Sequence, residues 1–344
     1  MTSAAWSMML MVTVNAILFH AMPRVSRPDI LFAVTVPEAF ALGAGRALVS
    51  RFRAIVWSGA VAALAIILVL PSPQSRSGPG AWLMMAVVTG NMIVALAAWL
   101  WAHQKARAYA VAPPAVRVAS LAARDTSLPG GPLVAAGPFA ILLATALLVY
   151  AFRDEALDAP GTLNPFQWLA FGGVYVAMSL IVAMSMARRT RQIAVDGPAA
   201  VAEQRYRRVN VLVPVLVGYG VAIQVSAATV ESIPAFGGTL GGRLWLVTMP
   251  MMLVNFGVTL WMFRVGQGGQ RAVAPAARQE IHGDATPDHA WKIGGLWYFN
   301  PRDPAIWVEN RIGPGYGLNM GNPRAWLLIA GMMLVPMIAA RLLF

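Results

Sequence analysis

Eight apolar stretches, each close to the length of a membrane span, constrain this chain more than any other feature. They cover residues 4–22, 54–71, 81–102, 132–152, 167–187, 209–230, 244–263 and 325–343. A helix needs about 20 residues to cross the ~30 Å hydrocarbon core of a bilayer. The stretches lack the alternation of a barrel strand, and backbone groups in lipid are satisfied only in helices or closed barrels. The sequence therefore predicts an all-α integral membrane protein, a bundle of about eight transmembrane helices.

Basic residues gather on every second loop, and this predicts the orientation of the spans. The first, third, fifth and seventh loops hold 22 of the 26 Lys and Arg residues. Basic loops are retained in the cytoplasm, so both termini are expected outside. The first stretch has no basic segment before it and no small-residue cleavage site after it, so we expect it to stay as the first span. The net charge of +12 then faces anionic inner-leaflet lipid, and no nucleic-acid partner is expected.

The chain divides into four predicted parts. Residues 1–264 form a seven-span membrane domain, with an interfacial segment at 27–53 in which ILFAVTVP is extended and Pro37 opens a helix. That helix either lies along the inner leaflet or extends the second span. Residues 265–286 have the composition of a flexible linker. Residues 287–324 form a cytoplasmic aromatic, Gly- and Pro-rich module with a small β-hairpin, and residues 325–343 form the last transmembrane helix.

Apart from Arg341 near the end of the last stretch, the spans contain no Asp, Glu, Lys or Arg, which counts against an ion-coupled transporter or a pump. Their polar exceptions are four amides, on the first, third, sixth and seventh spans: Asn15, Asn91, Gln224 and Asn255. Such amides either line a shared polar site or, more commonly, form hydrogen bonds between helices. If they face one water-accessible cavity, transport is favoured, and if they face different neighbours or lipid, binding is favoured.

Several kinds of chemistry are excluded or disfavoured. The chain has no cysteine, so it has no disulfide, thiolate metal site or thiol nucleophile. No Ser-His-Asp set, nucleotide-binding loop or catalytic carboxylate pair is recognisable, so we expect neither an enzyme nor a cofactor. IHGDATPDH brings together four residues of metal-ligand type, but its Gly and Pro suit a solvated loop better than a fixed metal site. These residues are His282, Asp284, Asp288 and His289.

The module has the most particular pattern in the chain. LWYF and AIWVE flank the turn-forming NPRDP, which predicts a β-hairpin with GYGLN as a candidate third strand. Its Trp and Tyr residues are types that anchor at the headgroup level, and its basic residues can meet lipid phosphates. These basic residues are Lys292, Arg302, Arg311 and Arg324. We therefore predict a membrane-docked hairpin, which either seals the bundle or recognises a lipid or a partner protein.

The pattern WYFNPxDP…NxGNPxAW, together with LFAVTVPEAF after the first span, carries a resemblance. It resembles the C-terminal domain of a bacterial family of multi-span membrane proteins of unknown function. Immunity proteins that protect toxin-producing cells are distantly similar. Where those proteins carry a Pro-x-His stretch after the fourth span, this chain has RDEALDAPGTLNPFQW, without His. The resemblance implies a multi-pass protein of the bacterial inner membrane.

We expect a non-enzymatic protein that binds a peptide, lipid or partner protein in sensing or protection. The alternative is a permease for an apolar or neutral solute, lined by the four amides. Expected partners are lipids of the anionic inner leaflet and a peptide or protein, and the oligomeric state is left open. The candidate contacts with the membrane or a partner are Trp297, Tyr298, Phe299, Asn300, Asp303, Trp307, Arg311, Asn319, Asn322 and Trp326.

Overall fold

A computed structural model of the chain describes residues 3–27, 29–69, 79–112, 126–153, 164–189, 197–231, 233, 236, 244–274 and 286–343. The chain folds into two units. The first unit is built from Met1–Arg117, Ala285–Phe299 and Glu309–Pro314, and the second from Val118–Asp284, Asn300–Val308 and Gly315–Phe344. Residues 287–324 thus contribute to both units in alternating pieces.

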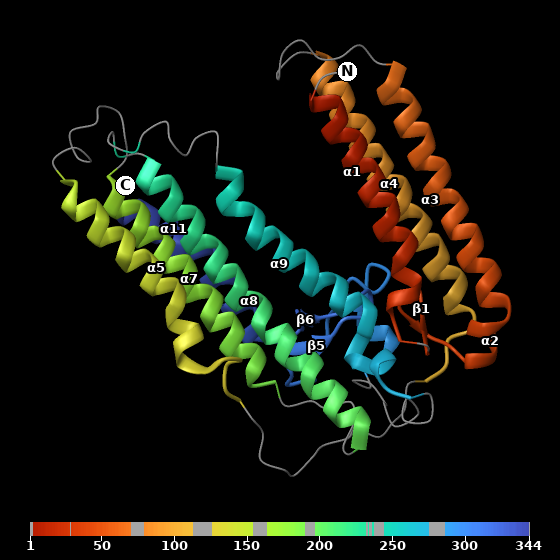
Figure 1. Cartoon of the computed structure of the whole chain (residues 1–344). Helices are drawn as coiled ribbons and strands as arrows, with labels where there is room; N and C mark the ends of the chain where they lie inside the picture. Colours follow the sequence, from red (N-terminus) through yellow and green to blue (C-terminus); the bar gives the residue numbers. More distant parts are fainter. Residues whose placement is uncertain are drawn as a thin grey trace. The chain divides into compact units, whose positions relative to one another are not determined.

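Three long helices run side by side in the first unit (Figure 1): α1 (Ser3–Val25), α3 (Ala44–Val69) and α4 (Pro79–Arg107). The buried residues of α3 follow the spacing of one helix face. They are Gly45, Phe52, Val56, Ala60, Ala63 and Ile67. Short elements cover one end of these helices, which we call the loop end of the first unit: β1 (Ile30–Leu31), β2 (Val34–Thr35), α2 (Glu38–Leu42), η2 (Asp288–Ala290), β3 (Trp291–Lys292) and β4 (Trp297–Tyr298).

The hairpin of β1 and β2 inserts its turn into the helix bundle of the first unit. Phe32 and Ala33 form the turn with φ angles of 49° and 65°. Such angles strain residues that carry a Cβ. The fully buried Phe32 ring offsets this cost by packing edge-on against Phe52 and Trp99, with ring centroids 5.1 and 5.2 Å away.

The segment after this hairpin contains the helix that the sequence predicts after Pro37. α2 begins at Glu38, and Pro37, which the sequence places in the first helical turn, is its N-cap residue. Residues 44–53, however, belong to α3, which continues into the second span without a break. From residue 44 the helix thus runs on into the second span, and α2 is a separate short helix before it.

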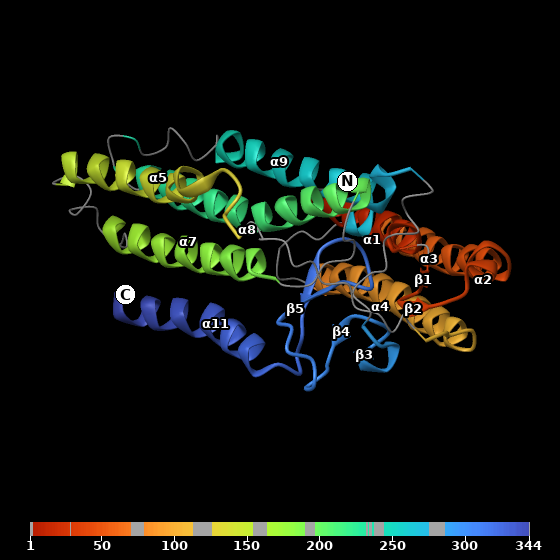
Figure 2. The same cartoon turned by 90° about the horizontal axis from the view of Figure 1, so that it is seen from below.

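Among its described residues, the second unit has five α-helices (Figure 2): α5 (Gly131–Ala151), α7 (Pro165–Ala187), α8 (Gly197–Glu231), α9 (Leu244–Val265) and α11 (Pro323–Leu343). α7 and α8 share the most extensive interface, and α11 packs on α7. A Cβ on Gly218 of α8 would lie 2.6 Å from Ser179 Oγ, so this glycine lets the two backbones approach closely. With 35 residues, α8 is about 52 Å long, well beyond the thickness of a hydrocarbon core.

The module does not form the predicted hairpin between LWYF and AIWVE. β4 pairs with β3, opposing Tyr298 to Trp291, whereas β5 (Trp307–Glu309) pairs with β6 (Tyr316–Leu318), which covers the GYGLN strand. Consecutive positive φ angles at residues 293–295 turn the chain back directly after β3. NPRDP forms a loop held by side chains, because its two prolines lack the N–H groups that a strand ladder needs.

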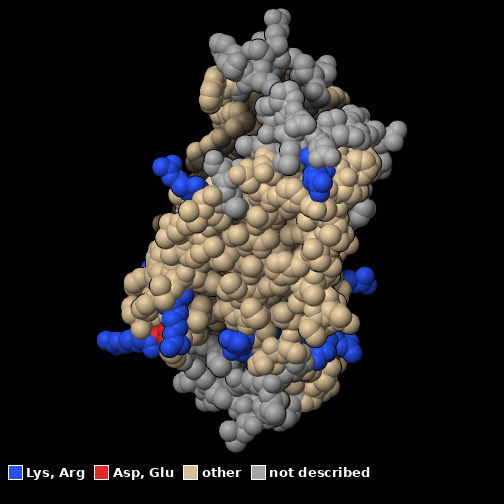
Figure 3. Space-filling model, turned by 90° about the vertical axis from the view of Figure 1, so that its left-hand side faces the viewer, with Lys and Arg blue, Asp and Glu red and all other residues tan. Residues whose placement is uncertain are grey.

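Seven of the described helices are long and apolar enough to cross a membrane, namely α1, α3, α4, α5, α7, α8 and α11. α9 covers the range of the remaining predicted span, and its segment Phe256–Val265 is apolar. On the face shown in Figure 3, Lys and Arg gather mainly at the lower edge of a broad uncharged band. Together these features confirm an all-α, multi-pass membrane protein.

Candidate anion-binding pocket

The loop that leads into α11 is organised around the side chain of Asn319, which is fully buried. Its Nδ2 group donates to the carbonyl oxygens of Asn300 (3.0 Å), Asp303 (3.0 Å) and Ala305 (3.2 Å). Its Oδ1 atom accepts from the backbone N–H groups of Asn300 and Gly321, both at 3.0 Å. A single amide therefore holds residues 300–305 in place where no strand ladder is available.

Two further side chains complete this loop. Asn322 caps α11, because its Oδ1 accepts from the backbone N–H of Arg324 at 2.9 Å while its Nδ2 donates to the Pro304 carbonyl at 2.9 Å. Asp303 Oδ1 accepts from the backbone N–H of Ala305 at 3.0 Å. The asparagines and the aspartate of the NPxDP…NxGNP pattern thus fix the loop against the start of the last span.

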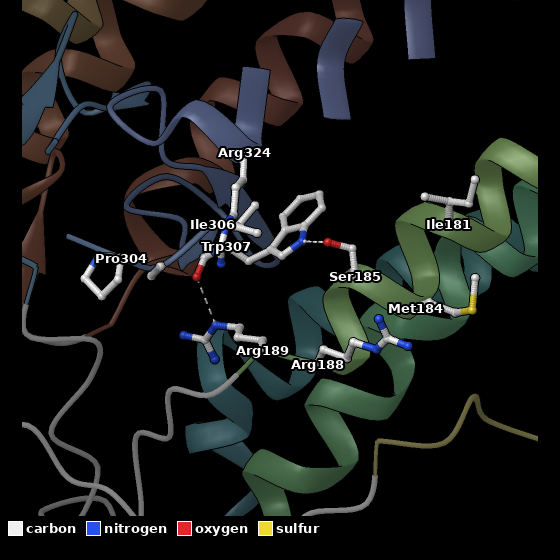
Figure 4. A pocket seen from close by; sticks show the side chains of 10 residues that line it. Ile181, Met184, Ser185, Arg188, Arg189, Pro304, Ile306, Trp307 and Arg324 are labelled. Atoms are coloured by element: carbon white, nitrogen blue, oxygen red, sulfur yellow. Dashed lines mark hydrogen bonds between the residues drawn. The ribbon is translucent and has the colours of Figure 1, made fainter. Parts of the chain in front are cut away.

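A pocket of about 480 Å³ opens between this loop and the C-terminal end of α7 (Figure 4). The last turn of α7 and the residues after it supply Ser185, Arg188 and Arg189. The loop supplies residues 304–307, and the start of α11 supplies Arg324. Since α7 ends and α11 begins here, the pocket lies where two transmembrane helices leave the apolar layer.

Trp307 and Arg189 form a fixed wall of the pocket. The indole Nε1 of Trp307 donates to Ser185 Oγ at 2.9 Å, and the Trp307 carbonyl accepts from Arg189 Nε at 3.4 Å (Figure 4). The guanidinium of Arg189 lies 4.3 Å from the centre of the Tyr316 ring, in cation–π geometry. Both residues are buried, so this wall is set before any ligand arrives.

A neighbouring helix fixes the backbone that carries the two α7 arginines. Arg207 of α8 donates to the carbonyl oxygens of Ala187 and Arg189. These carbonyls lie at the C-terminal end of α7, where the helix leaves its last acceptors unpaired and its dipole is negative. A guanidinium in this position caps the helix and holds Arg188 and Arg189 at the rim of the pocket.

Arg188 and Arg324 carry exposed side chains at the mouth of the pocket. Within the part of the chain that the structure describes, neither guanidinium has a carboxylate partner. Together with Arg189, three cationic groups border one pocket whose other wall includes Ile181 and Met184, 43% and 40% exposed. Planar guanidinium groups bind phosphate and carboxylate in a bidentate manner, so the pocket suits an anionic group joined to an apolar chain.

The predicted contact residues fall into two groups in the structure. Trp297, Phe299 and Trp326 are exposed, by 57%, 47% and 54%. The remaining residues are buried or half-buried and hold the fold together: Tyr298, Asn300, Asp303, Trp307, Arg311, Asn319 and Asn322. The second group is therefore not available to a flat membrane surface, although Trp307 lines the pocket.

Arg311 in particular does not reach lipid phosphate. Its guanidinium is 3% exposed and donates to Asp288 Oδ1 at 2.6 Å and Thr35 Oγ1 at 2.9 Å. Arg27 bridges to Glu309 at 3.3 Å in the same unit. Burial lowers the pKa of Arg311, and the charge of Asp288 acts in the opposite direction. Asp288, expected in a solvated loop, is thus half of a largely buried ion pair.

Three of the four amides of the spans, Asn15, Asn91 and Gln224, do not line this pocket. Asn15 and Asn91 belong to the first unit, and their Nδ2 atoms are buried without a hydrogen-bond partner among the described residues. Gln224 is exposed on α8. The side chain of Asn255 lies outside the described residues.

In the sequence, Ser185 belongs to the end of a span and Arg188 and Arg189 to a basic loop, and nothing there connects them with Trp307. Two arginines directly after the fifth span and another directly before the last span were the available signal. Their convergence could not be read from spacing, because 117 positions separate Arg189 from Ile306 and the Asn319 loop brings them together.

Seven membrane-length helices, with a basic pocket at the ends of two of them, define a multi-pass membrane protein. A family of unknown function (DUF5808) matches residues 301–326. No curated protein and no solved structure matches the chain significantly. The matched segment supplies residues 304–307 and Arg324 to the pocket, so the similarity coincides with one wall of the candidate site.

Proposed function

We propose that this chain is a non-enzymatic protein of the bacterial inner membrane that binds an acidic phospholipid in the pocket beside Trp307. The carrying observation is the placement of three guanidinium groups around an apolar-walled pocket at the ends of α7 and α11. In this proposal the pocket faces the cytoplasm, because 22 of the 26 basic residues lie on the loops at that side. In this proposal lipid binding serves sensing or protection, the role expected from the sequence.

A lipid fits the pocket better than a soluble peptide does. Ile181 and Met184 lie on α7 itself, so an apolar chain beside them would run along a transmembrane helix and remain in the bilayer. The phosphate of the same molecule would reach Arg188 and Arg324, and a basic residue near an anionic leaflet contributes about 1 kcal/mol. An acidic peptide could supply the negative charge, but its apolar side chains would have to move from water to the residues on α7, whereas a lipid chain is already in the bilayer.

The permease remains the second candidate and has less support. It requires a water-accessible cavity lined by the amides of the spans. Gln224 is exposed on the surface of α8, and neither it nor Asn15 or Asn91 lines the described pocket. An exposed Gln224 does not face a shared cavity with the other amides, and this arrangement favours a binding function over transport.

The test compares lipid affinities of the purified full chain. Titration with phosphatidylglycerol is expected to show saturable binding, and Arg188→Gln with Arg324→Gln should weaken it about 30-fold, the equivalent of about 1 kcal/mol for each charge. Arg341→Gln is the matched control, since this exposed arginine lies on α11 at its opposite end. Added salt should reduce the difference between the parent and the double variant.

Three results would contradict the proposal. If the double variant and Arg341→Gln lose the same affinity for phosphatidylglycerol, the charges attract the lipid nonspecifically and do not form a binding site. Equal affinities for phosphatidylglycerol and phosphatidylcholine would mean that the pocket does not select an anion. A chain-free glycerol phosphate that binds as tightly as the lipid would assign the pocket to a soluble ligand instead.

A further inference from the structure

A second group of basic and aromatic side chains lies in the first unit, where α1 packs on α3. His20 and Arg24 are four residues apart on α1, as are Arg53 and Trp57 on α3, so each pair shares one helix face. Arg53 Nε donates to the His20 carbonyl at 3.2 Å, and Trp57 Nε1 donates to His20 Nδ1 at 3.2 Å. These two bonds join the helices near the loop end of the unit.

The indole determines which nitrogen of His20 can donate. Because Nδ1 accepts from Trp57, the neutral ring carries its hydrogen on Nε2. The two rings meet edge-on, with centroids 6.3 Å apart. His20 therefore presents an N–H group beside the two arginines, and its orientation is held by Trp57.

Arg53 has a donor that nothing in the described structure satisfies. Its Nη2 atom is buried from solvent and has no hydrogen-bond partner there. Arg24, the other cation of the group, has no carboxylate partner among the described residues. A buried charged donor is costly unless it is paired, so the arrangement calls for an anion with several acceptor oxygens.

The surroundings identify the source of that anion. α1 and α3 are membrane-length helices, and Ile55 and Trp57 are 39% and 37% exposed on the same stretch of α3. An exposed indole beside arginines near the end of a span is characteristic of the headgroup level of a bilayer. A ligand here is thus in contact with lipid on one side and with the cations on the other.

We infer that Arg53, Arg24 and His20 bind the phosphate of one inner-leaflet acidic phospholipid, with Trp57 as the residue that positions His20. This site is independent of the pocket in the second unit, because it uses no residue of that unit. It would stand if the pocket beside Trp307 proved empty, and the reverse is also true.

The experiment measures phosphatidylglycerol binding to the purified full chain that carries Arg188→Gln and Arg324→Gln, so that the other pocket does not contribute. Adding Arg53→Gln is expected to weaken the remaining binding about fivefold to tenfold, since one charge and its hydrogen bonds are lost. Arg51→Gln is the matched control, because Arg51 is exposed on α3 two residues away and takes no part in the group. It should bind as its parent does.

A second variant tests the role of Trp57 without removing a charge. Trp57→Phe keeps an aromatic ring but loses the N–H that orients His20, and should weaken binding about threefold, the effect of one lost neutral hydrogen bond. Helix content by circular dichroism should equal that of the parent in every variant, which separates loss of the site from loss of the fold. Inorganic phosphate in excess should not displace the lipid.

The inference is overturned if the Arg53→Gln and Arg51→Gln variants bind the lipid alike. It is also overturned if Trp57→Phe has no effect and the effect of Arg53→Gln disappears at high salt. Displacement of the lipid by inorganic phosphate would show that the site takes a free anion and would overturn its assignment to a phospholipid. Failure of the site beside Trp307 shows itself separately, as an absence of the 30-fold effect of its own double variant.

Discussion

Replacement of Arg311 by methionine removes the centre of the ionic cluster in the first unit. Arg311 donates to Asp288, Thr35 Oγ1 and the carbonyl oxygens of Ala33 and Thr286. Methionine retains much of the volume but none of the donors. Asp288 keeps its bonds from the backbone N–H and hydroxyl of Thr35, yet loses its cation.

The expected cost follows from the burial of the two partners. Removing one member of a buried ion pair costs about 3–5 kcal/mol, because the other charge is left without compensation. Arg311 is 3% exposed but Asp288 is 25% exposed, so water can partly solvate the remaining carboxylate. We therefore expect about 3 kcal/mol, the lower end of that range.

Hydrogen exchange of the backbone amides in residues 286–299 measures this loss locally. At about 1.4 kcal/mol for each factor of ten, amides that exchange through opening of this segment should exchange about 100-fold faster. The exposed Arg302→Met is the control and should change the opening free energy by less than about 0.5 kcal/mol. Adding Asp288→Asn to Arg311→Met should restore part of the protection. An acceleration below threefold would refute the view that this cluster holds the segment.

Two further outcomes are expected. Gly321→Ala should destabilise the α11 loop by about 1–3 kcal/mol, since its Cβ would lie 2.5 Å from the Asn300 carbonyl carbon, whereas Gly331→Ala within α11 should be neutral or stabilising in thermal denaturation. Reporter fusions after Arg208 and Phe344 should read as cytoplasmic and external, respectively, and the opposite reading at either position would overturn the predicted orientation.

The spans could be predicted because their signal is local. The length and hydropathy of a run such as AIVWSGAVAALAIILVL are enough to predict a membrane-spanning helix, and the structure has α3 there. Pro37 at the start of α2 is equally local.

The module could not be predicted in the same way, because its arrangement depends on partners far along the chain. LWYF and AIWVE both have strand composition, and the sequence alone favours pairing them across the prolines between them. The turn at Ile293 and the two glycines after it pairs β4 with β3 instead. Asn319 holds the loop between LWYF and AIWVE through hydrogen bonds to residues 14–19 positions earlier in the chain. An arginine is ordinarily a surface residue, and Arg311 can be buried only because Asp288 and Thr35 accept its hydrogen bonds.

The same cluster has a consequence for the order of folding. The bond from Ser26 Oγ to the Arg311 carbonyl joins residues 285 positions apart, and that from Arg311 to Thr35 spans 276. The three helices of the first unit are synthesised early. Arg27 and Thr35, however, can bond to Glu309 and Arg311 only after residues 309–311 have been synthesised. Contacts of such separation form slowly. Until they form, the loop end of the first unit stays uncovered, and surface exposed in this way makes an unfinished chain prone to aggregation.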